Sequence, residues 1–130
     1  MKRQLFYFVA VGCAAGLTHM TVVALLVELG GWHPLVSNVA AFCVAFCVSA
    51  NGHSRLTFPQ PPAQWAEACR RYAVLAITSF TLNQTMYAYA LNLFGAKLYL
   101  PILAVVVLAV AVFTFTMSRI WAFALREKTA

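Results

Sequence analysis

Two arginines, each preceded by a serine at the end of a long apolar stretch, are the residues best suited to bind an anion. Arg55 lies in NGHSRLTF, residues 51–58, and Arg119 lies in SRIWAF, residues 118–123. A guanidinium donates paired hydrogen bonds that match the oxygens of a phosphate. At the edge of a bilayer it also acts as an anchor whose charge reaches the headgroups. Arg55 is therefore a candidate for both roles.

A second set of polar residues lies within apolar stretches, where polar groups are costly and need a partner or a function. His19 lies in the first stretch, and Asn83 and Gln84 lie near the middle of the third. Hydrogen bonds between helices explain all three residues. A polar path for a transported headgroup also explains them, and the sequence leaves both interpretations open.

Residues for bond-making chemistry are missing from these stretches. Glu28, Glu67 and Glu127 lie outside the middle of every apolar segment, and the chain has no phosphate-binding glycine loop and no nucleophile elbow. Cys43 and Cys47 lie one helical turn apart, but no second pair or nearby histidine completes a metal ligand set. We therefore expect no enzymatic activity, no cofactor and no metal site.

The composition indicates a membrane protein. Of the 130 residues, 63% are apolar and only 9% are charged, whereas soluble domains carry about 25% charged residues. Four segments are long enough to cross a bilayer as helices: residues 5–29, 34–58, 72–94 and 98–123. They lack the alternation of barrel strands. We predict an all-α integral membrane protein in which residues 1–130 form a single membrane domain.

The distribution of basic residues predicts its orientation. Every Lys and Arg except Lys97 falls on one side of the predicted membrane, and that side is expected to be cytoplasmic. Both termini and the polar loop 59–71 then face the cytoplasm. From Gln64 onward this loop could be helical, with Trp65 and Ala68 on the membrane surface. Because the basic residues form no contiguous patch, the net charge of +6 does not indicate nucleic-acid binding.

The chain reads as two tandem helical hairpins that resemble copies of one unit. Pro34 follows Arg3 at the same interval as Pro101 follows Arg70, and each proline is expected to open the second helix of its hairpin. The second helices end in SRLTF and SRIWAF. Two helices per unit keep the copies in the same orientation, which is a parallel repeat.

Small residues at helical spacing predict close helix contacts. Gly12 and Gly16 form one pair, with His19 on the same face, and we expect this face to mediate a homo-oligomer, most simply a dimer. The second segment carries a stripe at 3- and 4-residue steps that, continued as an α-helix, places Arg55 on the packed face; its members are Asn38, Ala41, Ala45, Ser49, Gly52 and Arg55.

The chain resembles the GtrA-like family of small four-helix membrane proteins over nearly its whole length. The first helix contains the family's F-x-x-V-G in FYFVAVG, residues 6–12. The second ends in HSRLTF, where the family has Asn-x-Lys/Arg-aromatic-x-Phe, and the fourth ends in SRIWAF. Two departures are His53 in place of Asn and Leu56 in place of an aromatic residue.

The resemblance implies that a polyprenyl-phosphate-linked sugar is moved across the bacterial inner membrane for cell-surface polysaccharide synthesis, between glycosyltransferases on the two faces. Arg55 and Arg119 are then the expected phosphate ligands. His53, His19, Asn83 and Gln84 are the expected contacts of the sugar or of its polar path. One alternative is a non-transporting membrane scaffold for a glycosyltransferase. Another is a small multidrug-type exporter, which is disfavoured because no intramembrane carboxylate is present to exchange protons for cations.

Overall fold

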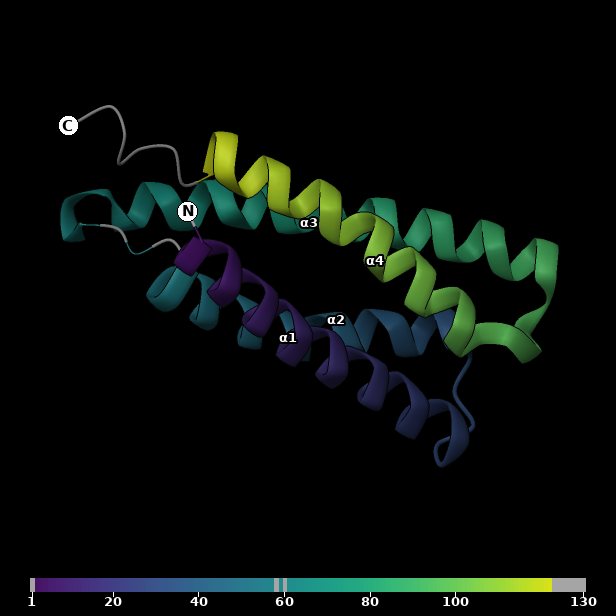
Figure 1. Ribbon diagram of the computed structural model, residues 1–130. Coiled ribbons are helices and arrows are strands. Elements are labelled where there is room, and N and C mark those ends of the chain that lie inside the picture. Colours follow the sequence, from purple (N-terminus) through teal and green to yellow (C-terminus); the bar gives the residue numbers. More distant parts are fainter. Residues whose placement is uncertain (1, 58, 60, 123–130) are drawn as a thin grey trace.

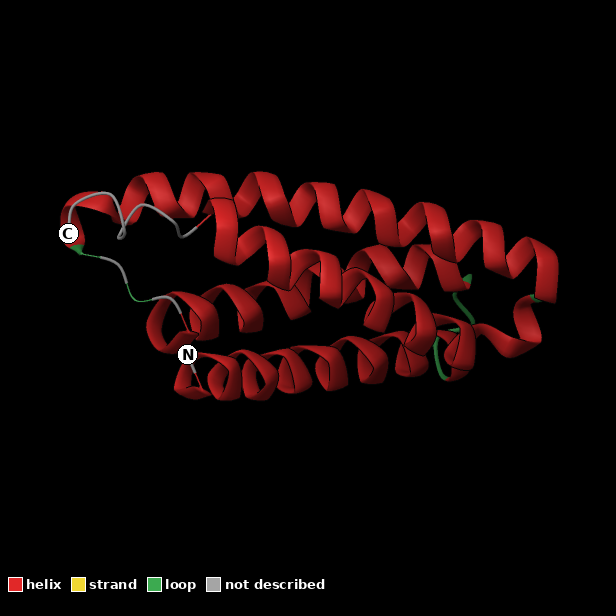
Figure 2. Cartoon of the chain, turned by 45° about the horizontal axis from the view of Figure 1, so that its top comes forward, coloured by secondary structure: helices red, strands yellow, loops and turns green. Residues whose placement is uncertain are grey.

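The computed structural model describes residues 2–57, 59 and 61–122, and this part of the chain is helical without any β-strand (Figures 1 and 2). Phe58 and Phe123, where two predicted helices end, lie outside the described residues, as do Arg126, Glu127 and Lys128. Four long helices form the fold: α1 (Lys2–Glu28), α2 (Pro34–Gly52), α3 (Pro62–Phe94) and α4 (Tyr99–Met117). Three short elements adjoin them: the π-helix η1 (His53–Thr57), the 3₁₀-helix η2 (Ala96–Leu98) and the π-helix η3 (Ser118–Ala122).

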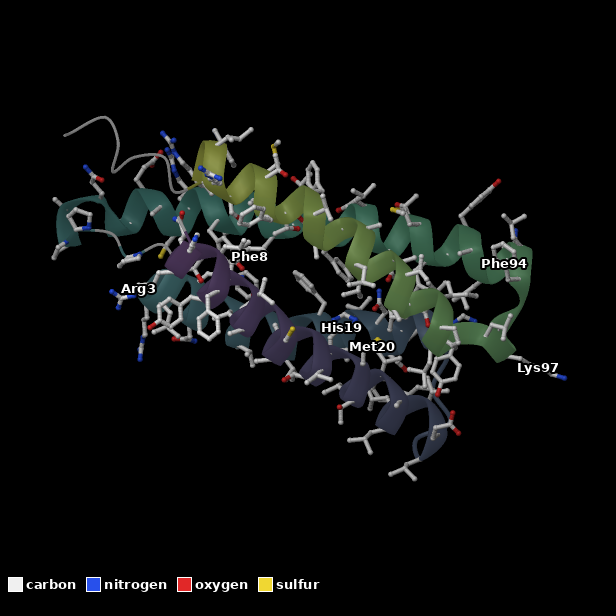
Figure 3. The ribbon with its side chains drawn as sticks, in the orientation of Figure 1. Arg3, Phe8, His19, Met20, Phe94 and Lys97 are labelled. Atoms are coloured by element: carbon white, nitrogen blue, oxygen red, sulfur yellow. The ribbon has the colours of Figure 1, made fainter. Side chains whose placement is uncertain are left out.

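The helices form two hairpins that lie side by side. α1 packs along α2 and α3 packs along α4, while α2–α3 and α1–α4 contacts join the hairpins. The start of α1, the end of α2, the start of α3 and the end of α4 all lie at one end of the bundle (Figure 1). Within the described residues this end carries every basic side chain except Lys97: Lys2, Arg3, Arg55, Arg70, Arg71 and Arg119. We call it the basic end, and Lys97 lies at the opposite end (Figure 3).

Prolines mark the starts of the helices, because a first-turn residue needs no backbone N–H. Pro34 opens α2, where the Nδ1 atom of His33 accepts a hydrogen bond from the Leu35 amide. Pro62 opens α3, so the helix begins ten residues before the predicted span at 72 and two residues before Gln64, from which a helix was considered possible. α4 begins at Tyr99, which places Pro101 within its first turn instead of at its first position.

Three helical segments are long and apolar enough to cross a membrane: Lys2–Glu28, Pro34–Thr57 and Ala96–Ala122. α3 is long but less apolar, because serine, threonine, asparagine and glutamine interrupt its middle. Thr78, Thr81 and Thr85 each donate a hydrogen bond to the carbonyl one turn earlier. Such bonds satisfy hydroxyl groups within the helix itself, which is what an apolar surrounding requires.

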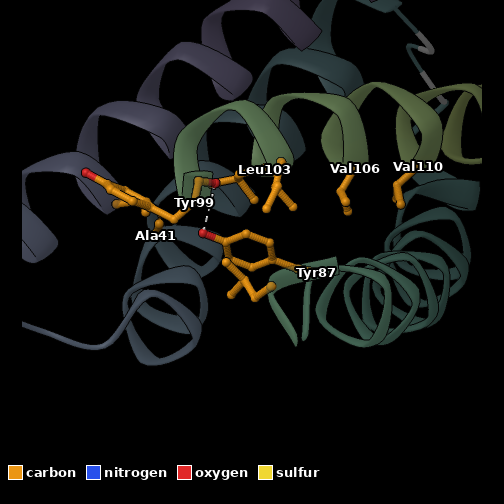
Figure 4. Close-up of a cluster of buried hydrophobic side chains, with 9 residues drawn as sticks. Ala41, Tyr87, Tyr99, Leu103, Val106 and Val110 are labelled. Carbon is orange, nitrogen blue, oxygen red and sulfur yellow. Dashed lines mark hydrogen bonds between the residues drawn. The ribbon is translucent and has the colours of Figure 1, made fainter. Parts of the chain in front are cut away.

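Two clusters of buried apolar side chains fill the bundle. The larger contains Tyr87, whose hydroxyl donates to the Tyr99 carbonyl (Figure 4). Its members are Val23, Ala41, Tyr87, Leu91, Tyr99, Ile102, Leu103, Val106 and Val110. The smaller, nearer the basic end, contains Ala68, Tyr72, Leu75 and Ala122. Ala68 is 1% exposed, so its predicted place on the membrane surface was wrong, and the side chain of Trp65 lies outside the description.

The close approach of α1 and α2 uses Gly52, which was predicted on the packed face of the second helix, instead of the pair Gly12 and Gly16. A Cβ atom added at Gly52 would lie 2.5 Å from Val11 Cγ1, whereas one at Gly12 or Gly16 would have no neighbour within 4 Å. The buried stripe of α1 is Val11, Ala15, His19 and Val23. Residues four apart are separated by slightly more than one turn of an α-helix. The buried stripe therefore winds slowly around α1 and comes into line with Gly12 only near His19. Among the described residues, no atom of another helix therefore occupies the space beside the Cα of Gly12 or Gly16.

Candidate functional site

The basic end contains Arg55 on η1, and the structure corrects its predicted direction. Ala41 and Ala45 are buried in α2, but beyond them the buried positions are His53 and Thr57, and Arg55 is exposed. In a π-helix each hydrogen bond joins residues that are five apart in the chain, whereas in an α-helix they are four apart. Each turn of a π-helix therefore contains more residues, and successive residues on one face lie further apart in the sequence. The packed face thus passes through His53 and Thr57, and Arg55 turns outward.

Arg55 has its hydrogen-bonding groups available. Among the described residues it makes no hydrogen bond, ion pair or cation–π contact. Arg119 is also exposed and lies in the equivalent π-helix at the end of α4. The two hairpins also resemble each other in structure, because the second helix of each ends in a five-residue π-helix that contains the pair Ser-Arg.

His53 belongs to the packing between the hairpins. Its ring stacks on Phe8 of α1, with 4.8 Å between centroids, and meets the ring of Tyr72 of α3 edge-on at 6.2 Å. Its Nδ1 atom lies 3.0 Å from Thr57 Oγ1, and the residue is 4% exposed. The structure thus brings His53 into the core beside Tyr72, while the neighbouring Arg55 points away from that core.

The start of α3 adds an ion-pair cluster at the basic end. Glu67 pairs with Arg70 at 2.6 Å and with Arg71 at 2.8 Å. The hydrogen bond from Arg71, together with the charge of Arg70, lowers the pKa of the Glu67 carboxyl. Arg71 also donates to the Trp121 carbonyl and lies over its ring. Arg71 therefore holds the start of α3 to η3, while Arg70 pairs with Glu67 within α3.

A buried polar network joins α1, α2 and α3 near the middle of the bundle. His19 lies between Arg3 and Lys97 along the bundle axis (Figure 3), and its Nε2 atom is 2.6 Å from Asn38 Oδ1. Asn38 Nδ2 donates to Asn83 Oδ1 at 2.9 Å and to Gln84 Oε1 at 2.6 Å. Gln84 Nε2 donates to the Leu35 carbonyl at 3.0 Å. The structure thus brings His19, Asn83 and Gln84 together around one side chain.

The central side chain, Asn38, was predicted to lie on the packed face of the second helix but was not among the predicted site residues. It is fully buried and bonds to the three predicted polar residues. The signal was present in the sequence, because Asn38 lies at helical spacing on the stripe of Ala41 and Ala45. A long polar amide on a face of small residues indicates a hydrogen-bonding partner on the facing helix.

Other hydrogen bonds connect the helices at different depths. Ser49 and Tyr72 join α2 to α3 through their hydroxyls at 2.9 Å, and Thr114 donates to Ser79 between α4 and α3 at 2.9 Å. At the opposite end the Tyr99 hydroxyl donates to the Glu28 carboxylate. The Ser49–Tyr72 and Tyr99–Glu28 bonds join the two hairpins, and the Thr114–Ser79 bond lies within the second hairpin. Among the described residues no group of His, Cys, Asp and Glu side chains could hold a metal ion.

The described part of the chain is an all-helical bundle, and three of its helical segments are long and apolar enough to cross a bilayer. Its basic side chains, except Lys97, lie at one end. These features define an integral membrane protein. Residues 7–123 match the family described as GtrA/DPMS, transmembrane domain, and the chain belongs to that family. Comparison with curated proteins and with solved structures finds no match. The family links the chain to the handling of polyprenyl-phosphate-linked sugars in membranes.

Proposed function

We propose that this protein translocates a polyprenyl-phosphate-linked sugar across the bacterial inner membrane, without catalysing a reaction, for the synthesis or modification of cell-surface polysaccharide. In this proposal α3 is the fourth membrane span and the basic end is cytoplasmic. A cytoplasmic glycosyltransferase loads the carrier lipid, and the sugar is used on the outer face. The segregation of basic side chains supports the orientation, because such residues accumulate on the cytoplasmic side.

The observation that carries the proposal is the exposed Arg55 guanidinium at the basic end, which has no partner among the described residues. A side chain that only stabilised the fold would be engaged as Arg71 is, with Glu67 and Trp121. A lipid phosphate at headgroup depth offers the oxygens that a guanidinium binds through paired bonds. Arg119, equally exposed on the second π-helix, supplies a related position on the other hairpin.

We expect Arg55→Gln to slow transport by about tenfold or more. A hydrogen bond to a charged group contributes about 1.5–3 kcal/mol, and each 1.4 kcal/mol corresponds to about a tenfold change. The measurement uses purified protein in liposomes that contain a polyprenyl-phosphate hexose with a fluorescent label on the sugar. A membrane-impermeant quencher added outside reports how fast labelled sugar leaves the inner leaflet.

Arg70→Gln is the matched control, because it removes the same charge from the same end but from a side chain paired with Glu67. We expect its transport rate to stay within about twofold of the wild type, since exposed ion pairs contribute little. Equal rates for Arg55→Gln and the wild type would remove Arg55 from the mechanism. A wild-type rate equal to that of protein-free liposomes would instead favour the scaffold for a glycosyltransferase.

A homo-oligomer, most simply a dimer, is part of the proposal, and its contact is the pair of Gly12, which is exposed, and Gly16, which is half-buried. Within the chain nothing lies within 4 Å of a Cβ atom at either position, while close helix contacts in membranes favour glycine. We expect the Gly12→Ala/Gly16→Ala variant to fold like the wild type but to cross-link less in membranes. Unchanged cross-linking would exclude this face, and loss of the folded monomer would contradict the structure.

A further inference from the structure

In the polar network around Asn38, a backbone carbonyl determines which side-chain atoms donate hydrogen bonds and which accept them. The carbonyl of Leu35 can only accept a hydrogen bond, so the Gln84 group facing it at 3.0 Å must be the amide nitrogen. The Gln84 oxygen then faces Asn38, where it accepts from Nδ2 at 2.6 Å. This orients the Asn38 amide as well, and its oxygen faces His19.

The orientation of Asn38 fixes the tautomer of His19. Since Asn38 Oδ1 accepts, the His19 Nε2 atom that lies 2.6 Å away must carry the hydrogen. In a neutral imidazole the other ring nitrogen, Nδ1, is then an unprotonated acceptor. The chain of bonds from the Leu35 carbonyl through Gln84 and Asn38 thus determines which nitrogen of His19 is available.

Two atoms of this network remain open. Among the described residues, His19 Nδ1 and Asn83 Nδ2 have no hydrogen-bond partner, whereas the two donor positions of Asn38 Nδ2 are both in use. Neither open atom is among the fully buried polar atoms that lack a partner, and His19 and Asn83 keep small exposed fractions of 7% and 6%. His19 Nδ1 is an acceptor and Asn83 Nδ2 is a donor. A ligand that carries hydroxyl groups can bond to both, because a hydroxyl both donates and accepts.

We infer that His19 Nδ1 accepts a hydrogen bond from a hydroxyl group of the lipid-linked sugar, with Asn38 and Gln84 as positioning residues that keep this nitrogen unprotonated. The inference rests on the proposed function and names the atom that contacts the sugar. Asn83 Nδ2 supplies a donor from α3. An apolar ligand would leave both atoms unsatisfied in an apolar surrounding, which is unfavourable, so the open pair selects for a sugar.

The tautomer is tested directly by nitrogen-15 NMR of histidine-labelled protein in micelles at a pH where imidazole is neutral. We expect an unprotonated Nδ1 and a protonated Nε2 for His19, and a shift of the Nδ1 signal when the polyprenyl-phosphate hexose is added. Gln84→Met releases the Asn38 amide from its anchor, so a mixture of tautomers is expected. A protonated Nδ1 in the wild type, or an Nδ1 signal that the ligand leaves unmoved, would overturn the inference.

The His19→Gln variant tests the role of Nδ1 separately from that of Nε2. Glutamine places an N–H where Nε2 lies and keeps the bond to Asn38, but it has no acceptor in the position of Nδ1. We expect normal folding and about tenfold slower transport in liposomes, the effect of one lost hydrogen bond that leaves its partner unsatisfied. His33→Gln, at an exposed histidine that caps α2, is the matched control and is expected to transport normally.

The two measurements distinguish this inference from the proposed function. Absence of wild-type transport together with a ligand-induced Nδ1 shift would overturn translocation while retaining His19 as a sugar contact. Wild-type transport that His19→Gln leaves unchanged would overturn the inference alone, and Arg55→Gln would still report on phosphate binding.

Discussion

Gly52→Ala is expected to destabilise the bundle by about 1–3 kcal/mol, the usual cost of adding a methyl group to a packed site. A Cβ atom at residue 52 would lie 2.5 Å from Val11 Cγ1 and 2.7 Å from Cγ2. Valine is stiff about its first side-chain bond, so these methyl groups cannot rotate away. The two helices must separate instead, which loosens the α1–α2 hairpin at the base of η1.

Reversible unfolding in mixed micelles, followed by circular dichroism, measures this free energy. The compensating variant is Gly52→Ala/Val11→Ala, which removes the clashing Cγ atoms and places a methyl group in their space. We expect it to recover most of the stability that Gly52→Ala loses. Gly12→Ala is the matched control on α1, where the added Cβ has no neighbour. A Gly52→Ala protein as stable as the wild type would show that α1 and α2 do not approach this closely.

Asn38→Leu is expected to have the larger effect, a loss of about 2–5 kcal/mol. It removes three hydrogen bonds, to His19, Asn83 and Gln84, and interhelical bonds in membranes contribute about 0.6–1.7 kcal/mol each. The residue is fully buried, so its former partners cannot all find replacements. Because Asn38 connects α1 with α3 through α2, its loss weakens both the first hairpin and the contact between the hairpins.

The same unfolding measurement applies, with Asn51→Leu as the matched control. Asn51 belongs to the same helix but is exposed, and its side chain donates to the Cys47 carbonyl of its own helix. We expect Asn51→Leu to change the free energy of unfolding by less than about 0.5 kcal/mol. Equal stabilities for Asn38→Leu and Asn51→Leu would contradict the buried network.

Much of the fold could be predicted because the physical signal is local. Apolar stretches of membrane length imply helices, since a chain in hydrocarbon must bond its own backbone groups. The prolines at 34 and 62 and the turn around Gly95 limit those helices. The start of α3 was left open because a proline followed by polar residues reads equally well as a loop or as a first helical turn.

The sequence predicted most residues of the candidate site, but it did not predict how these residues are arranged in space. His19, Asn83 and Gln84 are conspicuous as polar groups in apolar stretches, yet nothing local shows that Asn38 links them across three helices. Arg55 was placed on the packed face because an α-helical repeat was assumed, and the π-helix η1 changed that register. A π-helix depends on packing against neighbours, which a period of 3.6 residues does not reveal.

The sequence by itself determined the class of protein, the basic end and the family, because hydropathy, charge and short motifs are properties of consecutive residues. Only the tertiary structure decided which glycine lets two helices meet, which side chain organises the polar network and where Arg55 points. These depend on distances between helices that are far apart in the chain, as Gly52 and Val11 show. Contacts of that kind follow from packing, and packing is settled only when all the helices are in place.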